Sequence, residues 1–492
     1  MAPHFANEIP SHLLMWRRVR EYAVPPSMIE SAAARRAAGD WAGACAAARV
    51  HVDLDLRAVR RRHGTQVVTR LREDLRRLAP ELLRWHMPRI APDGRLRPGL
   101  TLSLARYGSD GGTPSHLVVR TPPAWADGGQ WMSLALWEGP GNSAPGHRLH
   151  GHHPHPHPER RFRLDLHRHL WDAGRSGELA ARCAAGEAPP HDSPWAKGSW
   201  AVEAELLLRA DGLSRGAFTV RLGARRRNVL ELVAPDDSHV PTLRPLPEGV
   251  LPPQEVAALP VLPEAAARVL PDLELLRTGL IPPGRLHPLV ATALAGYGSA
   301  PVDGPVPEPG DPHRVECRGE THRIALRDGV LTAVDHDPAQ LRREELLVAL
   351  GGPALPCLRA IDSVHRDPEA LPAVRERLRH GDVTGALAVV EGLLGPDAVL
   401  RDGPLREELE QAAARHLDHG LFRSGLVAVH PAAAGAAGGA DGSDGGGGAG
   451  DAGDAGAGRV KAGHRPRLNR FTPLPLRSKL VGRSRPRTGL AA

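Results

Sequence analysis

Two short stretches of this chain, 342 residues apart, share one pattern of glycine and aspartate. The pattern consists of Gly39, Asp40 and Gly43 in the first stretch and of Gly381, Asp382 and Gly385 in the second. A glycine can end one helix in a left-handed turn, and an aspartate directly after it can cap the next helix. The pattern therefore predicts a helical hairpin near each end of the chain.

The spacing of apolar residues changes between these two hairpins. Residues 15–90 have apolar side chains at three- and four-residue steps, as at Leu71, Leu75 and Leu78, which predicts a helical region. Residues 99–235 instead alternate apolar and polar side chains, which is typical of antiparallel strands with one buried face. We predict strands there at 102–107, 117–120, 131–137, 162–167, 200–209, 218–222 and 229–233.

A proline-rich connector, 236–262, follows, and we expect it to be extended. Residues 263–430 return to helical spacing, with a β-hairpin near 314–334 that turns at Asp328-Gly329. Asp337 is expected to cap a helix that starts at Pro338. The predicted fold class is α+β, with an N-terminal helical region, a central antiparallel β domain, a C-terminal helical region and a disordered basic tail.

The positive charge of the chain is concentrated at its C-terminus. The net charge is +7, but residues 459–492 hold ten basic residues and no acidic ones, so the rest is slightly acidic. Residues 431–458 are rich in Gly, Ala and Asp and are expected to form a disordered linker. A basic tail after such a linker can neutralise nucleic-acid phosphates, and equally it can act only as a solubilising tail. The candidate nucleic-acid-binding residues are Arg465, Arg467, Arg470, Arg477, Lys479, Arg483, Arg485 and Arg487.

Cysteine usage and hydropathy indicate a cytoplasmic protein. The four cysteines are widely spaced and form no C-x-x-C pair, so reduced thiols are expected. No apolar stretch is long enough for a transmembrane segment, and Met15 is a candidate for the native start. The sequence holds no nucleotide-binding or hydrolase motif of the common kinds, and we predict neither a catalytic residue nor a cofactor.

Histidines suggest metal chemistry only weakly. A His/Pro run lies at 147–157, where extended backbone favours a solvated loop over a defined metal site. His167 and His169 fall on the polar face of the predicted strand 162–167 and its continuation, so we expect two surface histidines. The sequence Asp335-His336-Asp337 resembles a metal-binding or acid–base cluster. However, the side chains of adjacent residues in a turn usually point in different directions.

A thiol–imidazole pair is the remaining candidate for nucleophilic chemistry. Cys317 and His322 flank the entry to the predicted hairpin, and Cys357 precedes a helix. Sequence alone does not bring these side chains together, so we interpret the cysteines as buried and inert.

The segment from Trp16 to Ile29 and residues 376–401 resemble parts of an uncharacterised protein family of GC-rich actinobacteria. This resemblance covers most of residues 15–427 and implies a cytoplasmic setting but no activity. The two Gly-Asp hairpins also resemble tetratricopeptide-type helical joints, although a solenoid needs about three stacked repeats.

Three hypotheses of function follow, in order of preference. The first is a non-enzymatic scaffold that binds an unknown protein partner through helical-hairpin surfaces. The second is a nucleic-acid-associated protein that binds through the basic C-terminal arm. The third is a metal-binding enzyme that depends on His and Asp residues.

Overall fold

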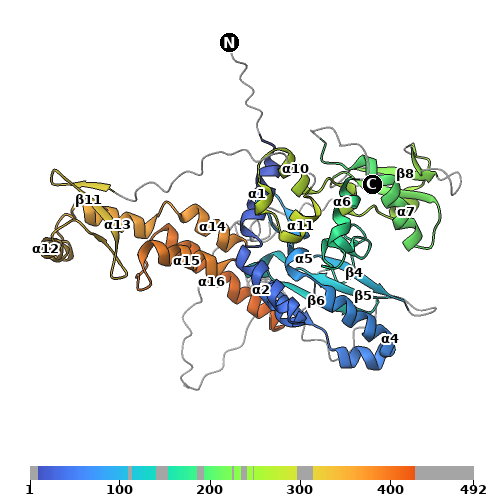
Figure 1. Ribbon diagram of the computed structural model, residues 1–492, viewed down its shortest axis with the longest axis horizontal. Coiled ribbons are helices and arrows are strands. Elements are labelled where there is room, and N and C mark those ends of the chain that lie inside the picture. The colour runs from blue at the N-terminus through green and yellow to red at the C-terminus, as the bar shows by residue number, and fades with distance from the viewer. Residues whose placement is uncertain are drawn as a thin grey trace, which may run out of the picture.

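A computed structural model describes residues 9–426, except for 109–113, 140–152, 154, 185–192, 224–225, 234–240, 248 and 296–313. Helices occupy both ends of the described chain and mainly antiparallel sheets lie between them, so the predicted α+β class is confirmed. The N-terminal helices and a four-stranded sheet form the centre of the molecule (Figure 1). A second sheet forms one end, and the C-terminal helices with a small hairpin sheet form the other. The predicted linker and tail, 431–492, lie outside the described residues.

The N-terminal region is helical, as predicted. Two of its helices begin with proline, whose fixed φ suits the first helical turn. Its helices are α1 (Ser11–Tyr22), α2 (Pro26–Ala37), α3 (Trp41–Ala47), α4 (Leu56–Arg77) and α5 (Pro80–His86).

The first Gly-Asp joint connects α2 to α3. Gly39 adopts a φ of +77°, and the Asp40 carboxylate accepts a 2.8 Å hydrogen bond from the Gly43 backbone N–H. The second joint connects α14 (Leu371–Arg379) to α15 (Val383–Leu394) in the same way. Its equivalents are Gly381, with a φ of +83°, and Asp382, which accepts from the Gly385 N–H at 3.2 Å. In each joint an arginine five residues before the aspartate also binds its carboxylate. Both predicted hairpins are confirmed.

The central sheet has the strand order β1-β6-β5-β4. Its strands are β1 (Val50–Asp53), β4 (Thr101–Tyr107), β5 (Ser115–Arg120) and β6 (Met132–Trp137), and a short ribbon, β2 (Arg89–Ile90) with β3 (Arg95–Leu96), precedes them. Strands β4 to β6 pair antiparallel, whereas β1 pairs parallel to β6 and so brings the N-terminal region into the sheet. Two short 3₁₀ turns between β5 and β6, η1 (Ala124–Ala126) and η2 (Gly128–Gln130), lie at the end of the sheet.

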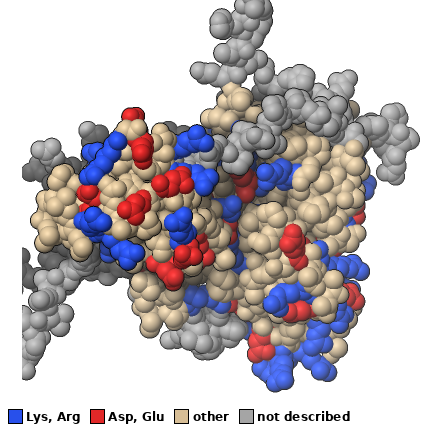
Figure 2. Space-filling view, turned by 60° about the vertical axis from the view of Figure 1, so that its left-hand side comes forward, with Lys and Arg blue, Asp and Glu red and all other residues tan. Residues whose placement is uncertain are grey.

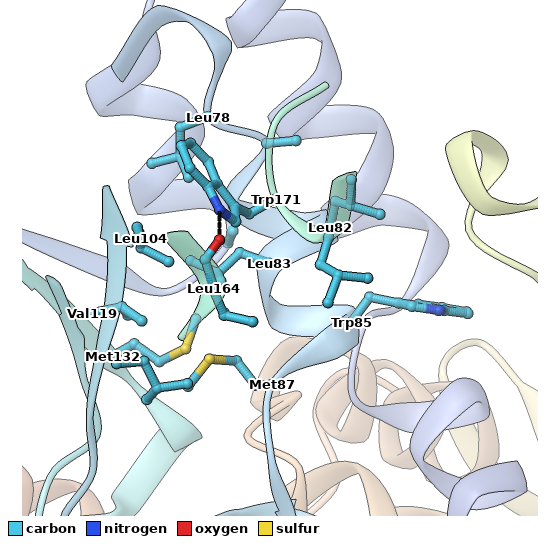
Figure 3. Close-up of a cluster of buried hydrophobic side chains, with 14 of the residues drawn as sticks. Leu78, Leu82, Leu83, Trp85, Met87, Leu104, Val119, Met132, Leu164 and Trp171 are labelled. Carbon is cyan, nitrogen blue, oxygen red and sulfur yellow. Dashed lines mark hydrogen bonds between the residues drawn. The ribbon is translucent and has the colours of Figure 1, made fainter. Parts of the chain in front are cut away.

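The main core lies between this sheet and helices α4 and α5 (Figure 3). Leu78, Leu83 and Trp171 are buried side by side, and Leu104 and Val119 extend the cluster from the sheet. The Trp171 indole N–H donates a 3.0 Å hydrogen bond to a backbone carbonyl, which satisfies its only polar atom within the core.

Two predicted strands are wrong. Residues 162–167 form 3₁₀ turns, and residues 200–209 lie in a helix, α7. The apolar positions of α7 fit both periods, but Trp200, Ala204 and Leu208 are buried at four-residue steps while Val202 and Leu206 are exposed. Helix-favouring Ala, Leu and Glu therefore decide the local structure. The elements here are η4 (Leu164–Leu166), η5 (Arg168–Leu170), η6 (Ser176–Glu178), α6 (Leu179–Ala184), η7 (Lys197–Ser199) and α7 (Trp200–Ala210).

The second sheet packs against α7 over a core of its own. Its strands are β7 (Gly216–Arg221), β8 (Arg227–Val233) and β9 (Thr242–Pro245). The predicted extended connector, 236–262, is only partly correct, because β9 and a short helix, α8 (Pro253–Ala258), lie within it. Helix α9 (Glu264–Ala267) still belongs to this second core. The chain then returns to the main core with α10 (Pro271–Arg277), η8 (Pro283–Arg285) and α11 (Pro288–Ala293).

Residues 314–423, here called the C-terminal unit, have their own hydrophobic cores. The predicted hairpin turns at Asp328-Gly329, and Asp337 caps the next helix through a 3.1 Å bond from the Ala339 N–H, as expected. Besides α14 and α15, the elements are β10 (Arg314–Cys317), β11 (Glu320–Arg327), β12 (Val330–Ala333), α12 (Pro338–Ala349), α13 (Pro356–Arg366) and α16 (Pro404–Arg423). In the part of the chain that the structure describes, no helix has the length and apolar character to cross a membrane.

Candidate functional site

The C-terminal unit contacts the rest of the protein through α14 and α16, which pack on η1 and η2. The Arg423 guanidinium at the end of α16 binds the Asp53 carboxylate with both of its terminal nitrogens. His419 Nδ1 donates to the Ala126 carbonyl at 2.8 Å. Residues at the carboxyl end of β1 and in η1 thus fix α16 on the central sheet.

The second Gly-Asp joint is part of the same interface. A Cβ atom on Gly381 would lie 2.2 Å from the Gly129 carbonyl oxygen, so only glycine allows this close approach of two backbones. Arg49 donates to the His380 carbonyl at 2.9 Å and lies 3.5 Å from the Asp382 carboxylate. The first joint has no such contact, since nothing lies within 4 Å of the corresponding Cβ position on Gly39.

A cleft of about 450 Å³ lies beside this interface, between η2 and the helices α14 and α16. We call it the arginine cleft. Its charged lining residues combine arginines from β3, α14 and α16 with carboxylates from the η1–η2 connection and α16, and they are Arg95, Asp127, Arg375, Arg379, Glu408 and Arg415. Among the described residues that line it, arginines outnumber carboxylates by four to two.

Each carboxylate that lines the cleft is held in an ion pair. Asp127 pairs with Arg95, and both side chains are buried. The Glu408 carboxylate accepts a 2.7 Å hydrogen bond from Arg375 Nε. Arg379 is paired in the same way with Glu376 of its own helix. The pairs hold guanidinium groups in place along a lining in which arginines outnumber carboxylates, and such a lining suits an anionic ligand with planar carboxylate or phosphate groups.

A smaller hollow of about 40 Å³ lies farther along the same face of α16, near the C-terminal end of the helix. His51 stacks on Trp131 with ring centroids 4.3 Å apart, and its Nε2 lies 3.4 Å from His419 Nε2. Burial, aided by the nearby Arg423 charge, lowers the pKa of His51 to about 4. The His51 ring is therefore neutral near pH 7, and the hollow is filled by packed rings rather than by a reactive pair.

Helix α4 carries a second concentration of arginine. All eight arginines of this completely described helix are exposed: Arg57, Arg60, Arg61, Arg62, Arg70, Arg72, Arg76 and Arg77. Figure 2 shows basic side chains gathered at the lower end of the molecule, where α4 lies in Figure 1. Beside the helix, a hollow of about 310 Å³ is lined by Arg70, Arg77 and arginines of neighbouring segments.

Cysteine and histidine side chains converge inside the C-terminal unit. Cys317, His336 and Cys357 are buried, and one potential ligand atom from each lies within 4.8 Å of the others. Burial, together with a hydrogen bond to Cys317, raises the pKa of Cys357 to about 11. The sequence interpretation of buried cysteines is confirmed, but it missed that His336 lies beside both of them.

The sequence-predicted site residues have mixed outcomes. The candidate nucleic-acid-binding residues Arg465 to Arg487 lie outside the described part of the chain. So does much of the His/Pro run. Of its described residues, His153 is not a solvated side chain, because its Nε2 bonds the Thr121 carbonyl at 2.9 Å.

The prediction of two surface histidines is wrong. His167 and His169 are buried, because the segment turns in 3₁₀ geometry instead of alternating as a strand. His167 Nε2 lies 3.1 Å from a Glu203 carboxylate oxygen, and the carboxylate also accepts two 2.6 Å bonds from Arg182. This triad, in which His167 and Glu203 are buried and Arg182 is partly exposed, joins the 3₁₀ turns to α6 and α7.

The triad predicts a pH dependence of stability. Burial alone would raise the pKa of Glu203, but the hydrogen bonds from His167 and Arg182 outweigh it and lower the pKa to about 2. A carboxylate whose pKa is lower in the folded state stabilises the fold above its unfolded pKa and loses that effect as the pH falls. We expect stability to drop between about pH 5 and pH 2, and to drop less for Glu203→Gln.

Urea denaturation at several pH values checks this expectation. Glu231→Gln, at a more exposed arginine pair on β8, is the matched control and should keep the wild-type pH profile. Equal acid sensitivity of Glu203→Gln and the wild type would contradict the role of Glu203.

Comparison with known proteins adds no relative: no family model, no curated protein and no solved structure matches the chain. Function is therefore argued from the arginine cleft and the surfaces around it.

Proposed function

We propose that this protein is a non-enzymatic cytoplasmic scaffold that binds an acidic segment of a partner protein in the arginine cleft. The observation that carries the proposal is the convergence of Arg95, Arg375, Arg379 and Arg415 on one cleft of about 450 Å³. This volume suits a few side chains of an extended peptide. The four cysteines are free thiols, which agrees with a reducing compartment.

Binding fits this cleft better than acid–base catalysis does. The carboxylates that line it, Asp127 and Glu408, already serve as ion-pair partners for Arg95 and Arg375. A general acid or base needs a proton that it can exchange with a substrate, whereas these carboxylates accept hydrogen bonds from guanidinium groups. Guanidinium groups held at fixed orientations recognise planar carboxylates of a ligand by paired hydrogen bonds.

A second candidate function is nucleic-acid binding, and the exposed arginines of α4 favour it. Four guanidinium groups precede the kink of α4 at Gly64 and four follow it, and such groups can neutralise phosphates without reading base sequence. The basic tail with Arg465 to Arg487 would add affinity to such a surface. This function uses a different face from the arginine cleft, so variants can separate the two.

One titration tests both functions. A fluorescent octaglutamate peptide and a fluorescent single-stranded oligonucleotide are each added to the full chain, and anisotropy is followed. We expect the peptide to bind, and Arg375→Gln with Arg379→Gln to weaken it by about tenfold or more, since two charge-assisted hydrogen-bonding groups are lost. Arg60→Gln with Arg72→Gln on α4 is the matched control, with the same change in charge.

The oligonucleotide distinguishes the alternative. If α4 binds nucleic acid, the α4 pair of variants weakens oligonucleotide binding and reduces its salt dependence by a slope of about two, while the cleft variants do not. Truncation after Gly458 measures how much the basic tail contributes to the affinity for the oligonucleotide. A peptide that fails to bind, or binds equally to the wild type and the cleft variants, would overturn the scaffold proposal.

A further inference from the structure

The small sheet of the C-terminal unit places two potential metal ligands on one face. Cys317 is the last residue of β10, and a tight turn with positive φ at Arg318 and Gly319 leads into β11. In the antiparallel register, Cys317 pairs with Glu320 and Val315 pairs with His322. Paired residues project to the same face, so Cys317 and His322 lie on one side of the sheet. Both side chains are buried.

Two further ligands approach this face from outside the strands. His336 follows β12 directly, and its backbone N–H bonds the Ala333 carbonyl in a turn. Cys357 lies in the first turn of α13. Ligand atoms of Cys317, His336 and Cys357 lie within 4.8 Å of one another. Small movements of side chains would bring all three to metal-binding distances of about 2.0–2.3 Å from one ion.

His322 is the candidate for a fourth ligand. Its ring lies beside that of His336, with centroids 4.4 Å apart. The Nδ1 atoms of His322 and His336 are both buried and have no hydrogen-bond partner among the described residues. A buried imidazole nitrogen without a partner costs free energy unless another group, such as a metal ion, binds it.

We propose that Cys317, His322, His336 and Cys357 form a structural zinc site. Two thiolates with two imidazoles are a ligand set that suits tetrahedral Zn²⁺, and the soft sulfur ligands disfavour Mg²⁺ and Ca²⁺. The ligands come from β10, β11, the segment after β12 and α13, so one ion crosslinks the hairpin sheet to the helix. Such a link suits this part of the unit, because its local core contains few other buried apolar residues: Ala333, Leu341 and Leu355.

The first test is the metal content of the full-length protein. Protein produced with zinc in the medium is dialysed and analysed by mass spectrometry of its metals. We expect one zinc ion per chain, and loss of most of it in Cys317→Ser and in Cys357→Ser. Cys183→Ser is the matched control, because Cys183 belongs to the main core and should leave zinc content unchanged.

A second measurement covers the case in which the cysteine variants do not fold. Wild-type apoprotein prepared with a chelator is titrated with Co²⁺, and its absorption spectrum is recorded. We expect saturation at one equivalent, with a thiolate-to-cobalt charge-transfer band and the intense visible bands of tetrahedral Co²⁺. His322→Ala should keep the thiolate band but change the visible bands, since it removes one nitrogen ligand.

Several results would overturn the proposal. These are a dialysed wild-type protein without stoichiometric metal, a Co²⁺ complex without a thiolate band, and a Cys317–Cys357 disulfide in the intact protein under non-reducing mass analysis. Retention of wild-type spectra by His322→Ala would overturn the assignment of the fourth ligand.

Discussion

Replacement of Asp272 by alanine is expected to destabilise the protein by about 3–5 kcal/mol, because it leaves a buried arginine charge without its partner. The Asp272 carboxylate on α10 accepts hydrogen bonds from Arg20 on α1 at 2.9 and 2.7 Å. It also accepts a 3.0 Å bond from the Trp85 indole N–H. Both charged side chains are at most 1% exposed, so water cannot replace the lost carboxylate.

Urea denaturation followed by tryptophan fluorescence measures this effect. Glu205→Ala, which removes a partly exposed ion pair with Arg209, is the control and should cost at most about 1 kcal/mol. The double variant Arg20→Met with Asp272→Leu should recover much of the lost stability, since it removes both buried charges. If Asp272→Ala lowers the free energy of unfolding by no more than the control does, the buried pair does not stabilise the contact between α1 and α10.

Replacement of Gly381 by alanine is expected to have the second large effect, about 2–5 kcal/mol. An alanine in the left-handed region costs about 1–2 kcal/mol, and the overlap of its Cβ with the Gly129 carbonyl adds the cost of a backbone shift. Since this contact lies between the C-terminal unit and the central sheet, the change should also loosen the docking of α14. Hydrogen exchange in α14 and η2 should then become faster.

Gly39→Ala is a close control for this substitution. Its φ of +77° is nearly the same as that of Gly381, but nothing lies within 4 Å of its Cβ position. We therefore expect only the conformational cost, about 1–2 kcal/mol, and unchanged exchange in η2. Equal effects of the two substitutions would show that the close contact contributes nothing.

The comparison of sequence with structure shows which signals are local. The Gly-Asp joints, the turn at Asp328-Gly329 and the cap at Asp337 depend on a few adjacent residues, and each is confirmed. The strand predicted at 200–209 is wrong. Trp200, Ala204 and Leu208 fit both the two-residue period of a strand and the 3.6-residue period of a helix, and the helix propensity of the segment decides between the two structures.

The candidate sites were harder to predict, since their residues come from distant parts of the chain. Arg95 and Arg375 meet only because the C-terminal unit docks on η2, and no local pattern encodes that contact. The Cys317 cluster was not predicted either. Cys317 and His322 share a face because the chain makes a further turn at Arg318 and Gly319, whereas the predicted hairpin turned at Asp328-Gly329. His336 and Cys357 join this cluster because α13 packs on the sheet, and the sequence did not predict that packing.

The Arg20–Asp272 pair also has a consequence for synthesis on the ribosome. Asp272 follows Arg20 by 252 residues. At elongation rates of about 5–20 residues per second, roughly 13–50 s pass between the synthesis of Arg20 and that of Asp272. During that interval Arg20 and the apolar face of α1 cannot adopt their final burial, because α10 does not yet exist. The nascent chain therefore exposes the apolar face of α1 for much of translation. General chaperones bind growing polypeptides that expose such apolar segments.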